Sequence, residues 1–452
     1  MTVKSFKGGA HPPERKERSS GIPVEVVHDV KQVVLPVNQH LGAPLKVLVA
    51  VGDKVVRGQK VADGEGRMTV PLHAPVSGTV KKIEQALQSN NNEGPCIFIE
   101  AEGPQADADS AFMPPLDGFA CSKQDALARV REGGIVGMGG AGFPTHVKLA
   151  PTKPISHVIA NGAECEPYLT IDERMMTERP GDVVEGLALI MHLVGAPKGV
   201  LAVEDNKVHV VAGLQQAIAE RGHGLSIEVQ LLKTKYPQGG EKMLIEAVTG
   251  KQVPSGGLPM DVGCVVENVG TIVALLEAFK LGKPLIDRGF TVTGGACASP
   301  KNIVAPIGTL VSDLAAAGVI KIDDDNLGRV LFGGPMMGVA VPNYAIPIQK
   351  NTSGITFMSK AEAKFFEESP CIRCGRCVRA CSCRLSPALL NSAIKANNLA
   401  EAQKIGLMDC IECGTCSFVC PAHQKLVQRF RVAKMAVRAE MQKAKEAQNA
   451  RK

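Results

Sequence analysis

The chain has 452 residues and a formal net charge of +6, and 45% of its residues are hydrophobic. At about 150 residues per domain, this length predicts roughly three domains, each able to bury a core of its own. The chain has no Trp and only 3 Tyr. That scarcity argues against a protein that stacks nucleic-acid bases on aromatic rings, so no nucleic-acid partner is expected.

Neither the start of the chain nor any later stretch has the pattern of a targeting or membrane segment. The opening "MTVKSFKGGAHPPERKERSS" is polar throughout, unlike a secretory signal. The apolar stretch 183–203 is interrupted by Glu185, His192 and Lys198, whereas a bilayer-spanning helix needs about 20 predominantly apolar residues. We therefore expect a cytosolic chain with reduced thiols, with no transmembrane segment of its own and bound to a membrane only through partners.

Residues 1–100 are predicted to form a small β domain. Between residues 34 and 84, short Val-rich runs alternate with Gly and Pro turns, which is typical of a β sandwich. This pattern resembles the barrel-sandwich fold of biotinyl and lipoyl domains. A carrier domain of that fold needs a lysine at a hairpin tip, and none stands between Lys60 and Lys81. We therefore interpret the domain as structural.

Residues 101–121 are predicted to be a linker, because they are rich in Pro, Asp and Ala and have no periodicity. Residues 122–284 then alternate between strand-like runs such as "SHVIANG" and helix-like runs such as "VVAGLQQAIAERG". The first helix opens with a capping box from Ser122 to Asp125. Strands that alternate with helices predict a Rossmann-like α/β domain, in which helices cover a parallel sheet.

The loop "GGIVGMGGAGFPTHVK" at residues 133–148 holds six glycines in ten positions and leads to Pro144, a residue suited to a first helical position. Such a loop lets backbone amides surround an anion at the start of a helix, as phosphate groups require. Its match to G-x-G-x-x-G is weak, because a helix and not a strand is predicted before it. A plain structural turn is the alternative.

Three further stretches of this domain have polar or glycine-rich ends. "NGAECEPYLTIDER" at 161–174 gathers Glu164, Glu166, Asp172 and Glu173 after a predicted strand. "YPQGGEKMLIEAVTG" has Gly-Gly before a predicted helix, and "VENVGT" has an Asn at the start of another. Open α/β sheets bind ligands beyond the carboxyl ends of their strands. These helix starts favour a ligand with phosphates, and a solvated acidic loop is the alternative for the first stretch.

The rest of the chain divides into a β-rich and a helical part. Residues 285–345 are β-rich, and residues 346–421 are predicted to be helical and carry two runs of cysteines. From Pro421 onward, nine Lys or Arg stand against two Glu, so residues 422–452 are predicted to form a basic helical tail. Such a tail is typical of a solvated helix, and docking onto acidic lipid or an acidic partner is the alternative.

These motifs are similar to those of one known group of proteins. "GMGGAGFPTHVK", "NGAECEP", "YPQGGEKMLIEAVTGK" and "ENVGT" resemble the flavin- and NADH-binding subunit of respiratory complex I and of related hydrogenases and formate dehydrogenases. "FKGGAHPPERK" near the start and the cysteine runs near the end complete an order that resembles the C subunits of Rnf (Rsx) ion-translocating electron transport complexes. The resemblance extends from about residue 6 to residue 421.

The resemblance implies an FMN and NADH site in the α/β domain, a soluble-ligand-binding (SLBB) β-grasp domain at 285–345 and a helical two-cluster ferredoxin module. It implies that Glu164 and Glu166 tune the flavin and orient the nicotinamide rather than act as a general acid or base. One departure is Cys165, where the complex I pattern has glycine. The remaining residues that the resemblance places at the cofactor are Gly137, Gly139, Gly140, Gly142, Lys148, Asn161, Gly239, Gly240, Glu241 and Asn268.

The pattern C-x2-C-x2-C-x3-C occurs twice, at Cys371, Cys374, Cys377 and Cys381 and at Cys410, Cys413, Cys416 and Cys420. Three close thiolates hold one 4Fe-4S cluster, and in two-cluster ferredoxins the fourth Cys of each run binds the other cluster. We therefore predict Cys420 with the first three and Cys381 with the second three. Zinc is the alternative, although a four-ligand zinc site has no use for a third close Cys. Cys383 is predicted to bind no cluster.

These sites together predict a function. NADH gives two electrons as hydride whereas an iron-sulfur cluster accepts one at a time, so a flavin is expected between them. We predict the electron-input subunit of an NADH:ferredoxin oxidoreductase, peripheral to the cytoplasmic face of the bacterial inner membrane. The resemblance implies a cluster-bearing B subunit, the A, D, E and G membrane subunits, and ferredoxin as an indirect partner. A cluster-only relay, or a soluble flavin-dependent dehydrogenase or hydrogenase subunit, is the alternative.

Overall fold

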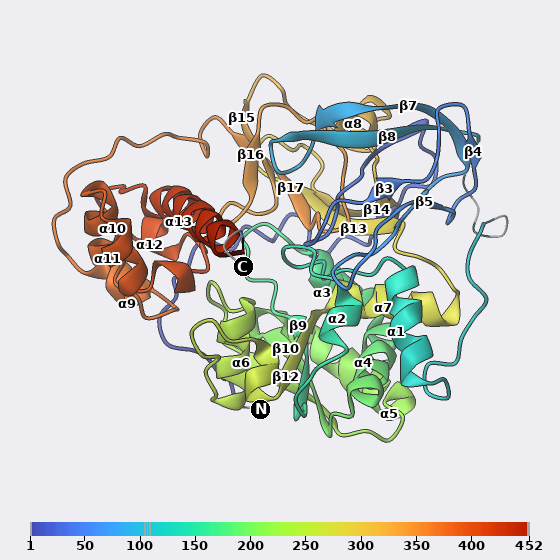
Figure 1. The fold of residues 1–452 in the computed structure, drawn as a ribbon, viewed down its shortest axis with the longest axis horizontal. Helices are drawn as coiled ribbons and strands as arrows, with labels where there is room; N and C mark the ends of the chain where they lie inside the picture. Colours follow the sequence, from blue (N-terminus) through green and yellow to red (C-terminus); the bar gives the residue numbers. More distant parts are fainter. Residues whose placement is uncertain (1, 104, 106, 108–109, 450–452) are drawn as a thin grey trace.

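The computed structural model describes residues 2–449 except 104, 106, 108 and 109. Those four positions fall in the predicted linker, and residues 450–452 fall in the predicted tail, so these parts of both predictions lie outside the described residues. The chain forms an N-terminal β sandwich, a parallel sheet with helices on both faces, a six-stranded mixed sheet and a C-terminal group of helices (Figure 1).

The β sandwich contains two small antiparallel sheets. One holds β2 (Gln32–Pro36), β8 (Glu93–Ala101), β7 (Gly78–Leu87) and β4 (Lys54–Val55), and the other holds β3 (Lys46–Val47), β5 (Lys60–Asp63) and β6 (Leu72–His73). Side chains from both sheets, such as Val33, Val61 and Ile97, are fully buried in one core. The sandwich agrees with its prediction, because alternate residues of the Val-rich runs point to the same face of a strand.

The residues before the sandwich strands pair with other parts of the chain, although the β domain was expected to begin at residue 1. Lys4 pairs with Leu232 at the edge of the parallel sheet, Ala10 pairs with Tyr236, and β1 (Glu25–Val26) joins the six-stranded sheet. Their polar composition shows no periodicity from which such distant partners could be predicted. We call residues 4–20 the N-terminal strap.

The parallel sheet has the strand order β11-β10-β9-β12. Its strands are β9 (His157–Gly162), β10 (Lys198–Glu204), β11 (Ile227–Leu232) and β12 (Cys264–Asn268), and its helices are α1 (Lys123–Glu132), α2 (Thr145–Lys148), α3 (Ile171–Glu178), α4 (Pro180–Val194), α5 (Val211–Arg221), α6 (Glu241–Thr249) and α7 (Val269–Lys280). Val158 and Ala160 of β9 pack in the core that contains α4 and α7, while Ile159 packs against α6. The sheet is thus covered on both faces, as the alternation of strands and helices predicted.

The sandwich and the α/β domain share one hydrophobic core, in contrast to the separate cores expected from chain length. That core contains Ile97 of the sandwich and Leu187 of α4. A buried lysine adds a polar connection at the same junction. Lys350 Nζ donates to Pro71 O at 2.9 Å and to Gly134 O at 2.8 Å. Lys350 therefore joins the start of the glycine loop to the sandwich at Pro71.

The six-stranded sheet has the order β1-β14-β13-β17-β15-β16. Its further strands are β13 (Asp287–Thr293), β14 (Lys301–Pro306), β15 (Leu327–Phe332), β16 (Val339–Val341) and β17 (Gly354–Ser359), and α8 (Val311–Ala316) packs into its core. Because β17 lies in the middle of the sheet, the β-rich part extends to Ser359, and the predicted boundary at residue 345 is corrected. The pairing of β17 with β13 joins residues about sixty positions apart, which no local pattern reveals.

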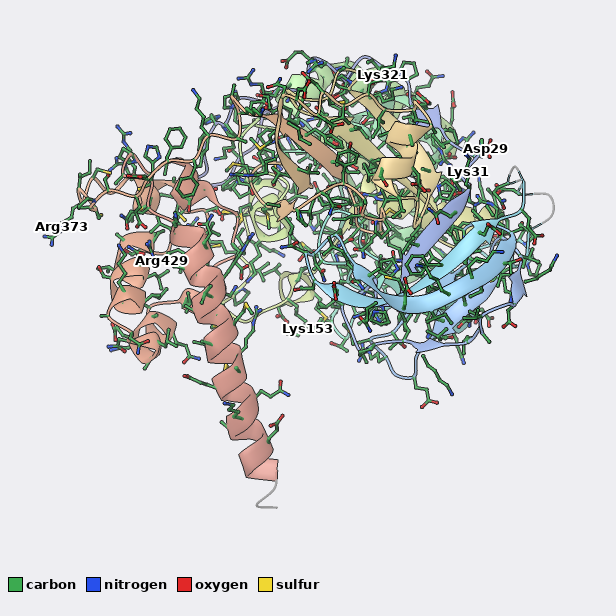
Figure 2. The ribbon with its side chains drawn as sticks, turned by 90° about the horizontal axis from the view of Figure 1, so that it is seen from above. Asp29, Lys31, Lys153, Lys321, Arg373 and Arg429 are labelled. Atoms are coloured by element: carbon green, nitrogen blue, oxygen red, sulfur yellow. The ribbon has the colours of Figure 1, made fainter. Side chains whose placement is uncertain are left out.

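The C-terminal module contains α9 (Arg376–Ala380), α10 (Pro387–Lys395), α11 (Leu399–Lys404), α12 (Thr415–Phe418) and α13 (Leu426–Asn449). Leu426, Phe430, Ala433 and Val437 of α13 are buried in the core of this module. The first half of the predicted basic tail is therefore a core helix and not a solvated one, because four apolar residues at helical spacing stand among its Lys and Arg. The second half extends away from the rest of the chain (Figure 2).

Candidate functional site

The bare backbone of the glycine loop lies beside the carboxyl end of β12. The loop connects α1 to α2, and α2 is a single turn of four residues, so it offers little of the helix dipole that the sequence led us to expect after Pro144. No atom lies within 4 Å of a Cβ added at Gly140, whereas a Cβ at Gly139 would lie 3.3 Å from Asn268 Cβ. The loop therefore presents an open face next to Asn268, a cradle that a side chain would fill and that a flat cofactor fits.

Two asparagines fix the geometry of this sheet edge. Asn161 Nδ2 donates to Gly239 O at 2.9 Å, just before α6, whose N-cap is Gly240. Asn268 caps α7 through its side-chain oxygen, and its Nδ2 donates to Asp172 Oδ2 at 2.7 Å. The two side chains therefore fix the ends of β9 and β12 relative to the starts of α6 and α7. The predicted glycines Gly239 and Gly240 lie at the start of α6.

Lys148 and two glutamates form a partly buried charge group at the end of β12. Lys148 Nζ lies 3.1 Å from Glu241 Oε1 and 3.9 Å from Glu267 Oε1. Burial lowers the pKa of Lys148, but attraction by Glu267 and Glu241 outweighs burial and raises it. Glu267 is 1% exposed, neither of its carboxyl oxygens has a hydrogen-bond partner, and burial raises its pKa to about 7. Glu267 was not among the predicted site residues. The feature that could have identified it is a charged residue inside the apolar run "CVVEN".

The two acidic residues predicted to act together point to different places. Glu164 Oε1 accepts from Asp172 N at 2.9 Å and so stays beside the sheet edge. Glu166 reaches the turn after β15, where its carboxylate accepts from Met336 N at 3.1 Å and from Met337 N at 2.8 Å. Burial raises the pKa of Glu166 to about 7, although both amides lower it. Glu166 thus ties the acidic loop to the six-stranded sheet.

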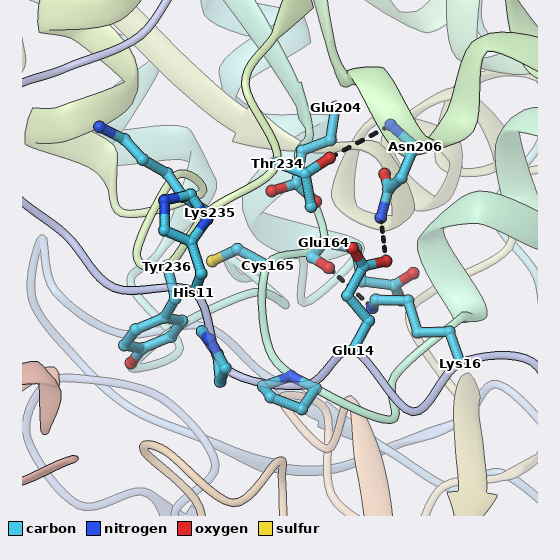
Figure 3. A pocket seen from close by; sticks show the side chains of 12 residues that line it. His11, Glu14, Lys16, Glu164, Cys165, Glu204, Asn206, Thr234, Lys235 and Tyr236 are labelled. Atoms are coloured by element: carbon cyan, nitrogen blue, oxygen red, sulfur yellow. Dashed lines mark hydrogen bonds between the residues drawn. The ribbon is translucent and has the colours of Figure 1, made fainter. Parts of the chain in front are cut away.

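A hollow opens beside Glu164, between the N-terminal strap and the ends of β9, β10 and β11 (Figure 3). Its lining includes His11, Lys16, Glu164, Cys165, Glu204 and Tyr236. Lys16 Nζ donates to Glu164 O at 2.8 Å and to Glu166 O at 3.0 Å, so the strap holds the acidic loop in place. None of the described glycine-loop residues lines this hollow, which therefore lies apart from the cradle at Gly140.

Cys165, the departure from the complex I pattern, lies between the strand end and the second glycine turn. Its Sγ accepts from Gly239 N at 3.2 Å. A Cβ added at Gly239 would lie 2.3 Å from Ala163 O, so this turn must approach the backbone after β9 closely. The thiol is accommodated at this turn because its Sγ is the acceptor for the Gly239 amide, and the same side chain also lines the hollow (Figure 3).

A second hollow, in the C-terminal module, is lined by Cys381 together with Cys410, Cys413 and Cys416. We call these four residues the inner cysteine set. Apolar side chains, among them Leu390 and Phe430, complete the lining. Within the described parts of the chain, no three His, Cys, Asp or Glu side chains surround a single-ion position, and these thiols surround a hollow instead. Free thiols that converge from two loops on an apolar hollow fit a 4Fe-4S cluster.

The other four predicted ligands, Cys371, Cys374, Cys377 and Cys420, form the outer cysteine set. Cys371 and Cys374 are exposed, and Arg373 between them stands at the outer end of the module (Figure 2). Burial raises the pKa of the Cys377 thiol, and the neighbouring Cys420 and Cys371 thiols raise it further. Helix α9, which contains Cys377, packs against α12, which ends two residues before Cys420, so the second run reaches the first one here. These thiols likewise fit one 4Fe-4S cluster.

Two residues near the inner cysteine set were not expected there. Cys383, predicted to be a spare thiol, also lines the inner hollow. Lys434 of α13 is 5% exposed, and its Nζ donates to Cys410 O at 2.8 Å and lies 2.7 Å from Glu412 Oε1. Only the packing of α13 brings this lysine to the Cys410 loop, because 24 positions separate the two residues in sequence.

Three family models match separate parts of the chain. The model described as the RnfC barrel sandwich hybrid domain matches residues 4–104, and the Nuo51 FMN-binding domain matches residues 130–277. A 4Fe-4S dicluster domain matches residues 363–421. The second match covers the glycine loop, the acidic loop and Asn268, and the third covers both cysteine sets.

Curated relatives resemble nearly the whole chain. The C subunit of the proton-translocating ferredoxin:NAD(+) oxidoreductase complex of Clostridium ljungdahlii is 42% identical over 98% of this chain and 96% of its own length. The C subunit of the Na(+)-translocating ferredoxin:NAD(+) oxidoreductase complex of Acetobacterium woodii is 42% identical over 98% of this chain and 100% of its own.

A solved structure supports the fold. The crystal structure of an NAD+-reducing [NiFe]-hydrogenase in the H2-reduced state aligns with 69% of this chain and 63% of its own, at a TM-score of 0.50 and 21% identity. No described helix has both the length and the apolar character needed to cross a membrane. The full-length identity with curated relatives shows that the chain belongs to the family of C subunits of Rnf-type ion-translocating ferredoxin:NAD+ oxidoreductase complexes.

Proposed function

We propose that this chain is the electron-input subunit of an Rnf-type complex and transfers electrons between NADH and the other subunits. The observation that carries this function is the combination, in one chain, of an open glycine-loop cradle at the sheet edge and a hollow lined by four cysteines of the repeated pattern. When bound there, FMN would supply the conversion that one-electron clusters require, because a flavin can take two electrons as one hydride and give them up singly.

We infer that the cradle holds FMN through backbone and a few charged groups. Gly137 and Gly140 leave the loop backbone approachable, because a Cβ at either position meets no atom closer than 3.7 Å. Lys148 provides a cation beside this face, and Asn268 provides an amide. Glu164 stays at the edge and can tune the electrostatic potential there. Glu166 acts as a positioning residue, since its carboxylate is taken up by the turn after β15.

We infer that the inner and outer cysteine sets each hold one 4Fe-4S cluster. The shared hollow of Cys381 with Cys410, Cys413 and Cys416 supports the crossed assignment. The packing of α9, which contains Cys377, against α12, which ends two residues before Cys420, supports its complement. With Cys383 in the same hollow, the inner set has a fifth thiol close by, and the ligand spacing assigns the iron to the four residues of the repeated pattern.

The mixed sheet is proposed to be the soluble-ligand-binding β-grasp domain. Its order β14-β13-β17-β15-β16, with β17 parallel to β13 and the single helix α8 in its core, supports that assignment. We further propose that the chain sits at the cytoplasmic face of the membrane. There it would deliver electrons to a cluster-bearing B subunit and, through the A, D, E and G membrane subunits, exchange them with ferredoxin.

Anaerobic purification of the full chain tests the function. We expect about eight irons per chain, the content of two 4Fe-4S clusters, together with acid-labile sulfide and bound FMN. Addition of NADH should bleach both the flavin and the cluster absorbance. A chain that contains clusters but binds no FMN, or whose clusters stay oxidised with NADH after FMN is restored, would contradict the proposal.

A further inference from the structure

The N-terminal strap is clamped between the α/β domain and the inner cysteine set. Ala10 N donates to Tyr236 O, and Tyr236 N donates to Ala10 O, each at 2.8 Å. One residue earlier, Gly9 N donates to Ala380 O at 2.9 Å, and Ala380 directly precedes Cys381. The strap therefore joins the turn before α6 to the loop that contains Cys381 of the inner cysteine set.

Two glycines make this contact as close as backbone allows. Gly8 and Gly9 have φ values of +89° and +88°, in the region that favours glycine. A Cβ at Gly8 would lie 2.9 Å from Cys381 O, and a Cβ at Gly9 would lie 2.8 Å from Tyr236 O. Any other residue at these positions would push the cysteine loop and the α/β domain apart. The distance between the cysteine loop and the α/β domain therefore depends on glycine at both positions.

Tyr236 forms a second connection from the same place. Its ring is 1% exposed, and its hydroxyl donates to Cys413 O at 2.7 Å. The same residue lines the hollow beside Glu164 and Cys165 (Figure 3). One side chain therefore connects the acidic strand end of the α/β domain with Cys413, the second cysteine of the second run.

The outer cysteine set has a different environment. Cys371 and Cys374 are exposed, and Arg373 stands at the end of the module farthest from the sheets (Figure 2). Two more contacts support the inner set, because Arg384 pairs with Glu246 of α6 and Ser255 Oγ donates to Asp409, next to Cys410. The inner set is therefore the one that the α/β domain holds directly.

We propose that Gly8, Gly9 and Tyr236 are positioning residues that fix the inner cluster as the first electron acceptor, with the outer cluster as the exit. This inference rests on the proposed function. The electron count is balanced, because oxidation of NADH to NAD+ releases one proton and two electrons. Each cluster gains one of these electrons. The Tyr236 hydroxyl donates to the main-chain oxygen of Cys413 and not to a sulfur. It would hold the loop of an inner cluster in place, and its O–H dipole would favour the reduced, more negative state of that cluster.

The first test is Tyr236→Phe in the full chain with FMN and both clusters bound. Tyr344→Phe is the matched control, because its hydroxyl donates to Asp324 in the turn before β15, away from the cysteine sets. In an EPR redox titration we expect Tyr236→Phe to lower the potential of one cluster only, the one absent from Cys381→Ala. Equal potentials in both Tyr variants, or a shift of the cluster that Cys381→Ala retains, would overturn the inference. A wild-type chain that NADH cannot reduce would instead overturn the proposed function.

The second test is Gly9→Ala, with Gly52→Ala as control. Gly52 has a φ of +96° but no atom within 4 Å of an added Cβ, so it reports the backbone strain alone. In stopped-flow measurements, flavin reduction by NADH should be unchanged, while the following bleaching of the clusters slows about tenfold, as small misplacements of reacting groups can cause. Selective loss of the inner cluster would also support the inference. Cluster bleaching at the wild-type rate with full iron content would contradict it.

Discussion

Replacement of Gly140 by Val separates cofactor binding from folding. No protein atom lies within 4 Å of a Cβ at this position, and its backbone is outside the left-handed region. The free energy of unfolding should therefore change by only about 0.5 kcal/mol, as for other unconstrained surface sites. If FMN lies on this face, the added side chain overpacks the cradle at a cost of about 1–3 kcal/mol. That cost raises the Kd for FMN by about fivefold to about 150-fold.

The assay is a titration of flavin-free protein with FMN, followed by quenching of flavin fluorescence, with the thermal midpoint measured in parallel. Gly213→Val in α5 is the control, because Gly213 also has no atom within 4 Å of an added Cβ and lies far along the chain from the loop. Iron content should stay at the wild-type level in both variants. An unchanged Kd for FMN in Gly140→Val would show that the loop does not border the flavin.

The cysteine sets and the buried groups lead to three further predictions. Cys381→Ala and Cys413→Ala should lose the same cluster EPR signal, and Cys420→Ala should lose the other. Each variant should retain about four irons per chain. If Cys381→Ala and Cys420→Ala lost the same signal, the crossed ligation would be refuted. Phe430→Ala, at a site 1% exposed, should cost about 3–5 kcal/mol and lower the temperature at which the clusters bleach; an unchanged temperature would refute the role of α13. Burial lowers the pKa of Lys350 from 10.5 to about 7, so between these values the unfolded chain binds more protons, and the thermal midpoint should rise from pH 7 to pH 9. Lys350→Met should flatten that rise, and an identical slope in both proteins would show that Lys350 does not titrate there.

Much of the site was predictable because its signals are local. Asn268 stands at a helix start in the sequence and caps α7 in the structure. Ser122 likewise caps α1 by accepting from Asp125 N, but Asp125 contacts the Ser122 hydroxyl and not its amide, so only half of the predicted capping box forms. A cap depends on residues two or three positions apart, which any short window contains. Glu166 shows the opposite case. Its partners at Met336 and Met337 lie about 170 positions away, so its separation from Glu164 could not be derived from the acidic run.

The sequence by itself determined the kind of chemistry, because ligand number, cysteine spacing and glycine loops are properties of short stretches. It also determined the order of the β, α/β and helical parts through the period of their apolar residues. Only the tertiary structure decided which cysteines share a hollow, where the strap runs and which cluster the α/β domain holds. Those features arise from contacts such as Gly9 with Ala380 and Tyr236 with Cys413. Residues so far apart in the chain meet only when the whole molecule has packed.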